Sequence, residues 1–182
     1  MKCICTVVAL AVLLIAGCTS PDGQEHDITD RRIAEIKDQL RAKGPAEKEM
    51  SQLEPLMIDM AEAIVALVPD ITWRQLPTGL RLPCEAVPGD PDSASSWSLP
   101  DVVFDGPIPD SAWPAALAST RSVAERVGAD ELVVRVDKPG HHDIRLIGAD
   151  KVQFGLISRE ASVLSGQTGC HLNLSEQGSA GA

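Results

Sequence analysis

The sequence predicts an α+β fold: a two-layer sandwich in which an antiparallel β-meander packs against helices. Amphipathic helical patterns occupy the first part of the chain, and short runs rich in Val, Ile and Leu occupy the second. The turns that join these runs are short and contain Gly or Pro, which favours antiparallel pairing of consecutive strands. Strands that follow helices in this order indicate a sheet with helices on one face.

The first residues have the pattern of an export signal. Lys2 precedes an apolar run from Ile4 to Ile15. A helix of that length rises about 18 Å, well short of the roughly 30 Å hydrocarbon core, so the run is the apolar region of a signal peptide rather than a membrane span. We therefore expect residues 1–17 of the 182 to be removed. The remainder is long enough for one domain with its own core.

The signal ends in Ile15-Ala16-Gly17-Cys18, which looks like the lipobox of bacterial lipoproteins. That resemblance implies cleavage before Cys18, a diacylglycerol on its thiol and usually an acyl chain such as palmitate on its amino group. Several acyl chains anchor a protein because each buried CH₂ contributes about 0.8 kcal/mol. We expect residues 18–26 to be a lipidated tether that holds the protein on the extracytoplasmic face of the cell membrane. The alternative is a plain secretory signal that ends in a chance Cys.

The five cysteines divide into two groups. Cys3 and Cys5 leave with the signal, and Cys18 takes the lipid. Cys84 and Cys170 remain as one pair in an oxidising compartment, so we expect a disulfide with Cα atoms within about 7 Å. Metal binding and redox chemistry are the alternatives, although neither residue lies in a C-x-x-C motif.

The charge balance of the chain indicates which kinds of partner it can bind. The formal net charge is −10, and the only charged residue in the signal is Lys2, so the mature chain is more acidic still. An acidic surface repels phosphate backbones and is not attracted to anionic lipid headgroups. We therefore expect no nucleic-acid partner, and membrane attachment that depends on the covalent lipid.

Two helices are predicted after the tether. Residues 27–43 have apolar side chains at helical spacing and stop at Gly44-Pro45. The next helix is expected to have Pro55 in its first turn and to end before Pro69. Its apolar stripe, with a spacing of three and four residues, consists of Met50, Leu53, Met57, Met60, Ile64 and Leu67.

The remaining elements follow from short apolar runs and turn residues. Residues 72–76 and 79–84 are expected to form a hairpin, and the Pro-, Gly- and Ser-rich residues 86–98 a loop. A third helix should start from Asp110 or Ser111 as N-cap and end at Val127, with Gly128 next. Residues 102–104 are a short apolar run, and further strands are predicted at residues 132–136, 143–147, 152–157, 161–164 and 169–174. The single domain is expected to span residues 27–174, followed by a flexible tail over residues 175–182.

His141-His142-Asp143 is the most reactive-looking cluster, and His171 would make a zinc site possible if it lay nearby. Adjacent residues of a strand point to opposite faces, and Pro139-Gly140 predicts an exposed turn. We therefore expect neither a metal site nor a catalytic site here. The sequence also lacks a G-x-S-x-G motif and a phosphate-binding glycine loop, so no enzyme activity and no cofactor are predicted.

These observations favour a non-enzymatic interaction or accessory domain of the cell envelope, tethered to the membrane and contacting an unknown envelope protein. The alternative is a carrier of an apolar ligand or lipid, held in a cavity between the helix with the Met stripe and the sheet. A core filled with side chains at that place would favour the interaction domain.

The order of features resembles the LppA-like lipoproteins of mycobacteria. The resemblance covers most of the mature chain, and the segments that carry it are residues 15–18, 43–44, 71–73, Cys84, residues 124–129 and 169–170. It implies a lipid-anchored envelope protein whose activity is not defined. No catalytic residue can be carried over from that family.

Overall fold

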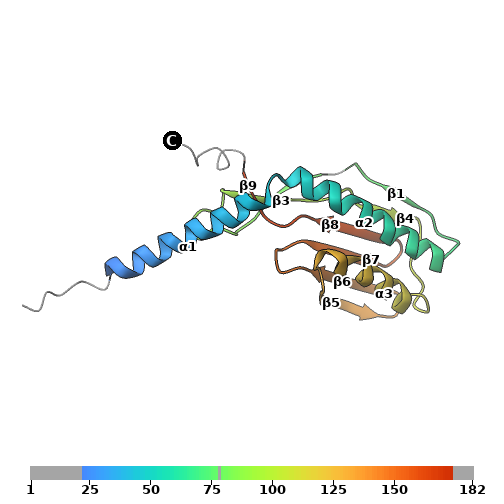
Figure 1. The fold of residues 1–182 in the computed structure, drawn as a ribbon. Coiled ribbons are helices and arrows are strands. Elements are labelled where there is room, and N and C mark those ends of the chain that lie inside the picture. The colour runs from blue at the N-terminus through green and yellow to red at the C-terminus, as the bar shows by residue number, and fades with distance from the viewer. Residues whose placement is uncertain (1–21, 78, 174–182) are drawn as a thin grey trace, which may run out of the picture.

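The computed structural model describes residues 22–77 and 79–173, and it contains three α-helices and two antiparallel sheets in these ranges (Figure 1). The helices are α1 (Asp22–Lys43), α2 (Ala46–Leu67) and α3 (Trp113–Ala124), and the 3-10 turn η1 (Glu125–Val127) extends α3. The strands are β1 (Trp73–Gln75), β2 (Arg81–Pro83), β3 (Ala94–Trp97), β4 (Val102–Phe104), β5 (Glu131–Lys138), β6 (His141–Ile147), β7 (Gln153–Ser158), β8 (Ser162–Gln167) and β9 (His171–Leu172). The predicted α+β fold is confirmed.

The larger sheet has the strand order β1-β4-β8-β7-β6-β5. Strands β5 to β8 form the predicted meander, since each pairs antiparallel with the next along the chain. Side chains alternate between faces, so His142, Ile144 and Leu146 of β6 are buried while their neighbours are partly exposed. The buried face packs against α2 and α3, and none of the helices in residues 22–77 and 79–173 covers the opposite face (Figure 1).

The core between α2 and the larger sheet is tightly filled. Met57 and Met60 are fully buried, together with Leu99 and Leu164. A Cβ atom added to Gly166 would lie 2.6 Å from Leu99 Cδ1 and 2.9 Å from Met57 Sδ, so side chains occupy the space beside this glycine. Around Gly166, therefore, side chains fill the space between α2 and the larger sheet, which favours the interaction domain over the carrier.

The smaller sheet has the order β2-β3-β9. It lies beside the end of the larger sheet, joined to it by the bridge between Ser98 and Gln167. A separate apolar cluster covers it and includes Leu40 from the end of α1, Val87, Ala94 and Leu172. Helix α1 reaches this sheet with its C-terminal half and extends away from the body with its N-terminal half (Figure 1).

The first two helices are longer than predicted. Helix α1 begins at Asp22 rather than Asp27, so residues 22–26, expected in the tether, are helical. Helix α2 begins at Ala46, which places Pro55 inside it rather than in its first turn. Pro55 is exposed and lacks an N–H, so one helical hydrogen bond is lost there. Burial of Leu53, Met57 and Met60 on the opposite side holds the helix together across that position.

The predicted hairpin of residues 72–76 and 79–84 is wrong. Strand β1 pairs with β4, with Trp73 opposite Phe104, and β2 pairs with β3. The side chain of Asp105 fixes the first pairing because its two oxygens accept from Thr72 N at 2.7 Å and Thr72 Oγ1 at 2.8 Å. The apolar face of β4 thus recruits β1 into the larger sheet, and β2 is left to start the smaller one.

The predicted loop of residues 86–98 contains strand β3. Its sequence Ala-Ser-Ser-Trp has no apolar alternation, yet Ala94, Ser95 and Ser96 are buried between β2 and β9. The buried hydroxyls are satisfied by side chains from neighbouring segments: Arg81 Nε donates to Ser95 Oγ at 2.8 Å, and Gln167 Nε2 donates to Ser96 Oγ at 2.6 Å. Small polar residues can therefore line a central strand when such donors exist.

The third helix begins at Trp113, with Ala112 at the N-cap position, so neither Asp110 nor Ser111 caps it. Pro114 lies in its first turn, where its missing N–H has no cost. At the other end, Gly128 adopts the left-handed conformation with φ 72°, as predicted for the residue that ends this helix. Strand β9 is shorter than predicted, and Cys170 directly precedes it.

Candidate functional site

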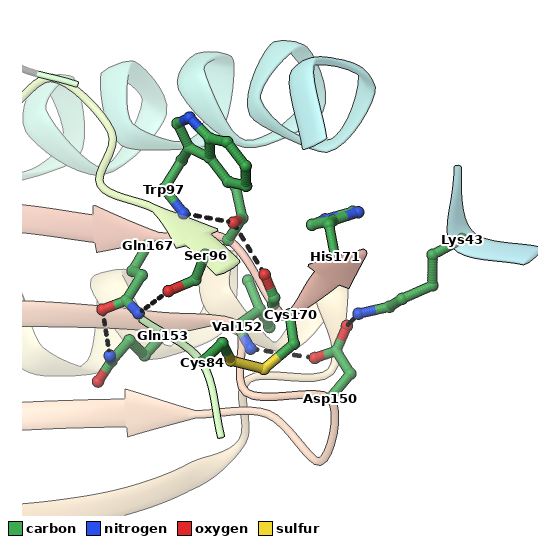
Figure 2. The surroundings of a disulfide bond; sticks show 12 residues. Lys43, Cys84, Ser96, Trp97, Asp150, Val152, Gln153, Gln167, Cys170 and His171 are labelled. Atoms are coloured by element: carbon green, nitrogen blue, oxygen red, sulfur yellow. Dashed lines mark hydrogen bonds and ion pairs between the residues drawn. A yellow bond between two sulfur atoms is a disulfide. The ribbon is translucent and has the colours of Figure 1, made fainter. Parts of the chain in front are cut away.

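Cys18, the predicted lipid attachment site, lies outside the described residues. The other two predicted site residues, Cys84 and Cys170, form a disulfide with Cα atoms 5.8 Å apart, within the expected distance (Figure 2). Cys84 directly follows β2 and Cys170 directly precedes β9, so the bond joins the two outer strands of the smaller sheet. The two cysteines are 86 residues apart in sequence. In the chain-entropy model, closing a loop of that length stabilises the fold by about 4.5 kcal/mol.

The disulfide also belongs to the apolar cluster that receives α1. Cys170 is buried with Leu40 and Leu172, and Ile33 and Ile36 of α1 pack against this cluster with half-buried side chains. Ile33, Ile36 and Leu40 are the apolar side chains at helical spacing in residues 27–43, and they face the smaller sheet. The cross-link therefore stiffens the surface on which α1 rests.

A salt bridge and a close backbone contact surround Cys170. Lys43 Nζ lies 3.0 Å from Asp150 Oδ2, and Asp150 Oδ1 accepts from Val152 N at 3.1 Å (Figure 2). Burial raises the pKa of Asp150, but the bond to Lys43 and the Val152 N–H outweigh it and hold this pKa below its usual value. Position 169 requires glycine because it lies against Lys43 and Asp150. A Cβ added there would lie 2.6 Å from Lys43 Nζ and 2.7 Å from Asp150 O.

A row of polar side chains connects the two sheets. Gln153 Nε2 donates to Gln167 Oε1 at 2.6 Å, and Gln167 in turn donates to Ser96 of β3 (Figure 2). Beside this row, Trp97 N donates to Thr168 Oγ1 at 2.9 Å, and Thr168 N donates to Trp97 O at 2.9 Å. These bonds fix the end of β8 against β3.

The disulfide, the end of α1 and the Gln153–Gln167 pair line a groove of about 830 Å³. Its apolar walls come from Leu40, Pro83 and Ala149, and its polar walls include Gln39 and Lys43. Such a mixed lining can hold a chain that has both apolar and hydrogen-bonding groups. Sequence reasoning found the two cysteines of this groove but missed Gln153 and Gln167. Their pairing depends on the register of β7 against β8.

The His141-His142-Asp143 cluster differs from its prediction in one respect. His142 is buried rather than exposed at a turn. Its Nδ1 lies 2.7 Å from Asp137 Oδ1, its Nε2 lies 3.0 Å from Asp110 Oδ1, and its ring stacks on Trp113. No sequence pattern connects His142 to Trp113, because only the fold brings the first residue of α3 against β6.

His171 lies in the other sheet. Its Nδ1 is 2.9 Å from Gly44 O, and its Nε2 bonds the Glu49 carboxylate. The imidazoles of His142 and His171 therefore do not converge. Within residues 22–77 and 79–173, no group of three or more His, Cys, Asp and Glu side chains is arranged to hold a metal ion.

Comparison with known proteins identifies the family. The model of the LppA family, described as a lipoprotein confined to pathogenic Mycobacterium, matches residues 21–174. The crystal structure of the lipoprotein LppA from Mycobacterium tuberculosis is similar with a TM-score of 0.70 at 19% identity, over 87% of this chain and 95% of that chain. At this identity the likeness concerns the fold alone.

A weaker likeness is to the crystal structure of a DUF4853 family protein from Actinomyces odontolyticus, with a TM-score of 0.49 and 12% identity over 71% of this chain and 69% of that chain. A search of curated proteins found no match. The family model covers residues 21–174 of the 182. The chain therefore belongs to the LppA family of lipoproteins.

Proposed function

We propose that this lipoprotein is exported, is anchored through lipid on Cys18 to the extracytoplasmic face of the cell membrane, and acts there as a non-enzymatic interaction or accessory domain. The observation that carries the proposal is the lipobox at residues 15–18, directly after an apolar signal region. Membership of a lipoprotein family supports it. Among the helices that the structure describes, none combines the length and apolarity that a membrane crossing requires.

The position of α1 gives the anchor a structural role. Only Thr19, Ser20 and Pro21 separate Cys18 from the first residue of this helix. Its 22 residues correspond to a rise of about 33 Å. In this proposal α1 is a spacer that holds the two sheets away from the lipid surface, with its far end fixed to the cluster around the disulfide.

The surroundings of the two buried histidines support a non-enzymatic role. Both ring nitrogens of His142 bind carboxylates, and its ring face is covered by Trp113. Both ring nitrogens of His171 also have protein partners. An imidazole in such an environment has no free nitrogen with which to move a proton of a substrate. The filled core beside Met57 further favours an interaction domain over a carrier with a ligand between α2 and the sheet.

The anchor is tested by the Cys18→Ala variant in a bacterial host that processes lipoproteins. We expect uncleaved precursor and no labelling by a fatty-acid analogue, because the acceptor thiol is gone. The matched control is the Cys84→Ser/Cys170→Ser variant, which removes the two disulfide cysteines but keeps Cys18 and should label like the wild type. Normal labelling of the Cys18→Ala protein would refute the anchor.

A further inference from the structure

A second pocket lies on the face of the larger sheet opposite α2 and α3. It has a volume of about 230 Å³, and its lining includes two arginines, Arg135 and Arg145, and one acidic residue, Asp101. The full chain has a formal net charge of −10, so two arginines beside a single acid make an unusual local excess of positive charge. Such an excess favours an anionic ligand.

The backbone is shaped to place Arg145 in this pocket. Arg145, Gly155 and Ser165 lie opposite one another on β6, β7 and β8. A Cβ added to Gly155 would lie only 1.8 Å from Arg145 Nη1, so the guanidinium lies over the glycine. Arg145 Nη1 donates to Ser165 Oγ at 2.9 Å, which fixes the guanidinium on the sheet. One face of the group is thus covered by β7.

An irregularity in β5 brings the second guanidinium to the same face. Val133 pairs with Arg145 and Val134 with Ile144, but Val136 pairs with Asp143, so Arg135 is the extra residue of a β-bulge. Bulges re-aim side chains and are frequent beside binding sites. Arg135 therefore lines the same pocket as Arg145, and its guanidinium carries five N–H donors.

The charge balance selects the kind of anion. Two guanidiniums and Asp101 leave one net positive charge in the pocket, which matches a monoanionic carboxylate better than a dianionic phosphate. Burial raises the pKa of Asp101, and the charge of Arg145 opposes this rise. Guanidinium groups bind carboxylates through paired hydrogen bonds, so Arg145 and Arg135 together can fix the orientation of such a group.

The pocket continues into the groove beside the disulfide. Gln153 and Gln167 line both, so a ligand with its carboxylate between the arginines can extend past these two amides. Each amide can make more hydrogen bonds than the ones that join Gln153, Gln167 and Ser96. A peptide chain can use this spare capacity, whereas an alkyl chain cannot. We propose that this face binds a peptide-like ligand through its terminal carboxylate. The proposal goes beyond membrane anchoring and does not depend on it.

The test uses the full mature chain in detergent and titrates four probes: N-acetyl-dialanine, its C-terminal amide, decanoate and inorganic phosphate. Calorimetry gives affinities, and NMR follows the Arg145 Nε–H and the Gly155 amide. We expect the free acid to bind and shift both signals, and the amide to bind at least tenfold more weakly. Equal affinity for the acid and its amide, or stronger binding of decanoate or phosphate, would overturn the proposal.

Three variants locate the site. Arg145→Gln should weaken binding of the free acid at least tenfold, and Gly155→Ala should do the same without changing any charge, because its methyl group displaces the guanidinium. The matched control is Arg159→Gln, which removes an exposed arginine from the turn after β7 and should stay within twofold of the wild type. Thermal melting checks that each variant folds. A folded Arg145→Gln protein with wild-type affinity would refute the assignment.

Discussion

The imidazole of His142 stacks on the indole of Trp113, with ring centroids 4.3 Å apart and ring planes inclined by 11°. His142 lies near the start of β6 and Trp113 is the first residue of α3, so the stack fastens one end of the meander to the helix layer. Asp110 strengthens this junction because its Oδ1 also accepts from Gly140 N at 2.9 Å.

Replacement of His142 by Phe should show how much the hydrogen bonds of His142 contribute to stability, apart from the stacking on Trp113. Phe keeps an aromatic ring against Trp113 but removes the bonds to Asp110 and Asp137, so we expect a loss of about 1–3 kcal/mol in unfolding free energy. Urea denaturation measures it. His141→Phe is the matched control, since His141 lies on the other face of β6, and it should change stability by less than about 0.5 kcal/mol. Equal losses for the two variants would contradict this role of His142.

Acid should weaken the fold through Asp105 and Asp110. The Thr72 N–H and hydroxyl hold the pKa of Asp105 below its usual value. The pKa of Asp110 is also lowered, mainly by the hydrogen bond from the Gly140 N–H and secondarily by the hydrogen bond with His142. A group whose pKa is lower in the folded state stabilises the fold above its unfolded pKa, and this contribution disappears as pH falls through the folded pKa. We therefore expect the unfolding free energy to decrease as pH falls below about 4.

The Asp105→Asn/Asp110→Asn variant separates these two groups from the other acids. It should be less stable than the wild type at pH 7 and should lose less stability between pH 4 and pH 2.5, as measured by urea unfolding at each pH. Asp70→Asn, at an exposed position, is the control and should follow the wild-type pH profile. An unchanged acid slope in the double variant would count against the assignment.

The filled core beside α2 predicts a cost for one added methyl group. Gly166→Ala places a Cβ against Leu99 and Met57, both fully buried, so we expect a loss of about 1–3 kcal/mol from overpacking. The control is Gly79→Ala, where the nearest atom is Ser98 O at 3.7 Å and the change should be nearly neutral. Wild-type stability of Gly166→Ala would mean that this core has free space, and it would revive the carrier hypothesis.

The parts of the fold that could be predicted from sequence are those specified locally. Strands β5 to β8 follow one another through short turns, and Gly140, with φ 70°, suits the first of these turns. Strand β3 could not be predicted because its buried serines have no apolar pattern and depend on donors such as Gln167, 71 residues away from Ser96. Nearness in sequence favours a hairpin of β1 with β2, and this predicted pairing is wrong. Burial of Phe104 in the core instead favours pairing of β1 with β4.

The same distinction applies to the candidate sites. Cys84 and Cys170 could be paired by elimination, since compartment and number leave no other partner. Arg135 and Arg145, which line the pocket proposed to bind a carboxylate, belong to no sequence motif. They line one pocket because a bulge in β5 and the register of β6 against β7 set their positions, and register is a property of the folded sheet.

The disulfide should govern both global stability and the attachment of α1. The Cys84→Ser/Cys170→Ser variant loses the constraint on a loop of 86 residues, so its unfolding free energy should fall by about 4–5 kcal/mol. Because Cys170 packs in the cluster that holds Ile36 and Leu40, amide hydrogen exchange in the second half of α1 should accelerate more than exchange in α2. The matched measurement is the wild type in reducing agent, which should reproduce both effects, whereas reducing agent should leave the double variant unchanged. If reduction alters neither the stability nor the exchange of α1 in the wild type, the cross-link has no such role. The spacer proposed between lipid and domain would then need another fixed point on the smaller sheet.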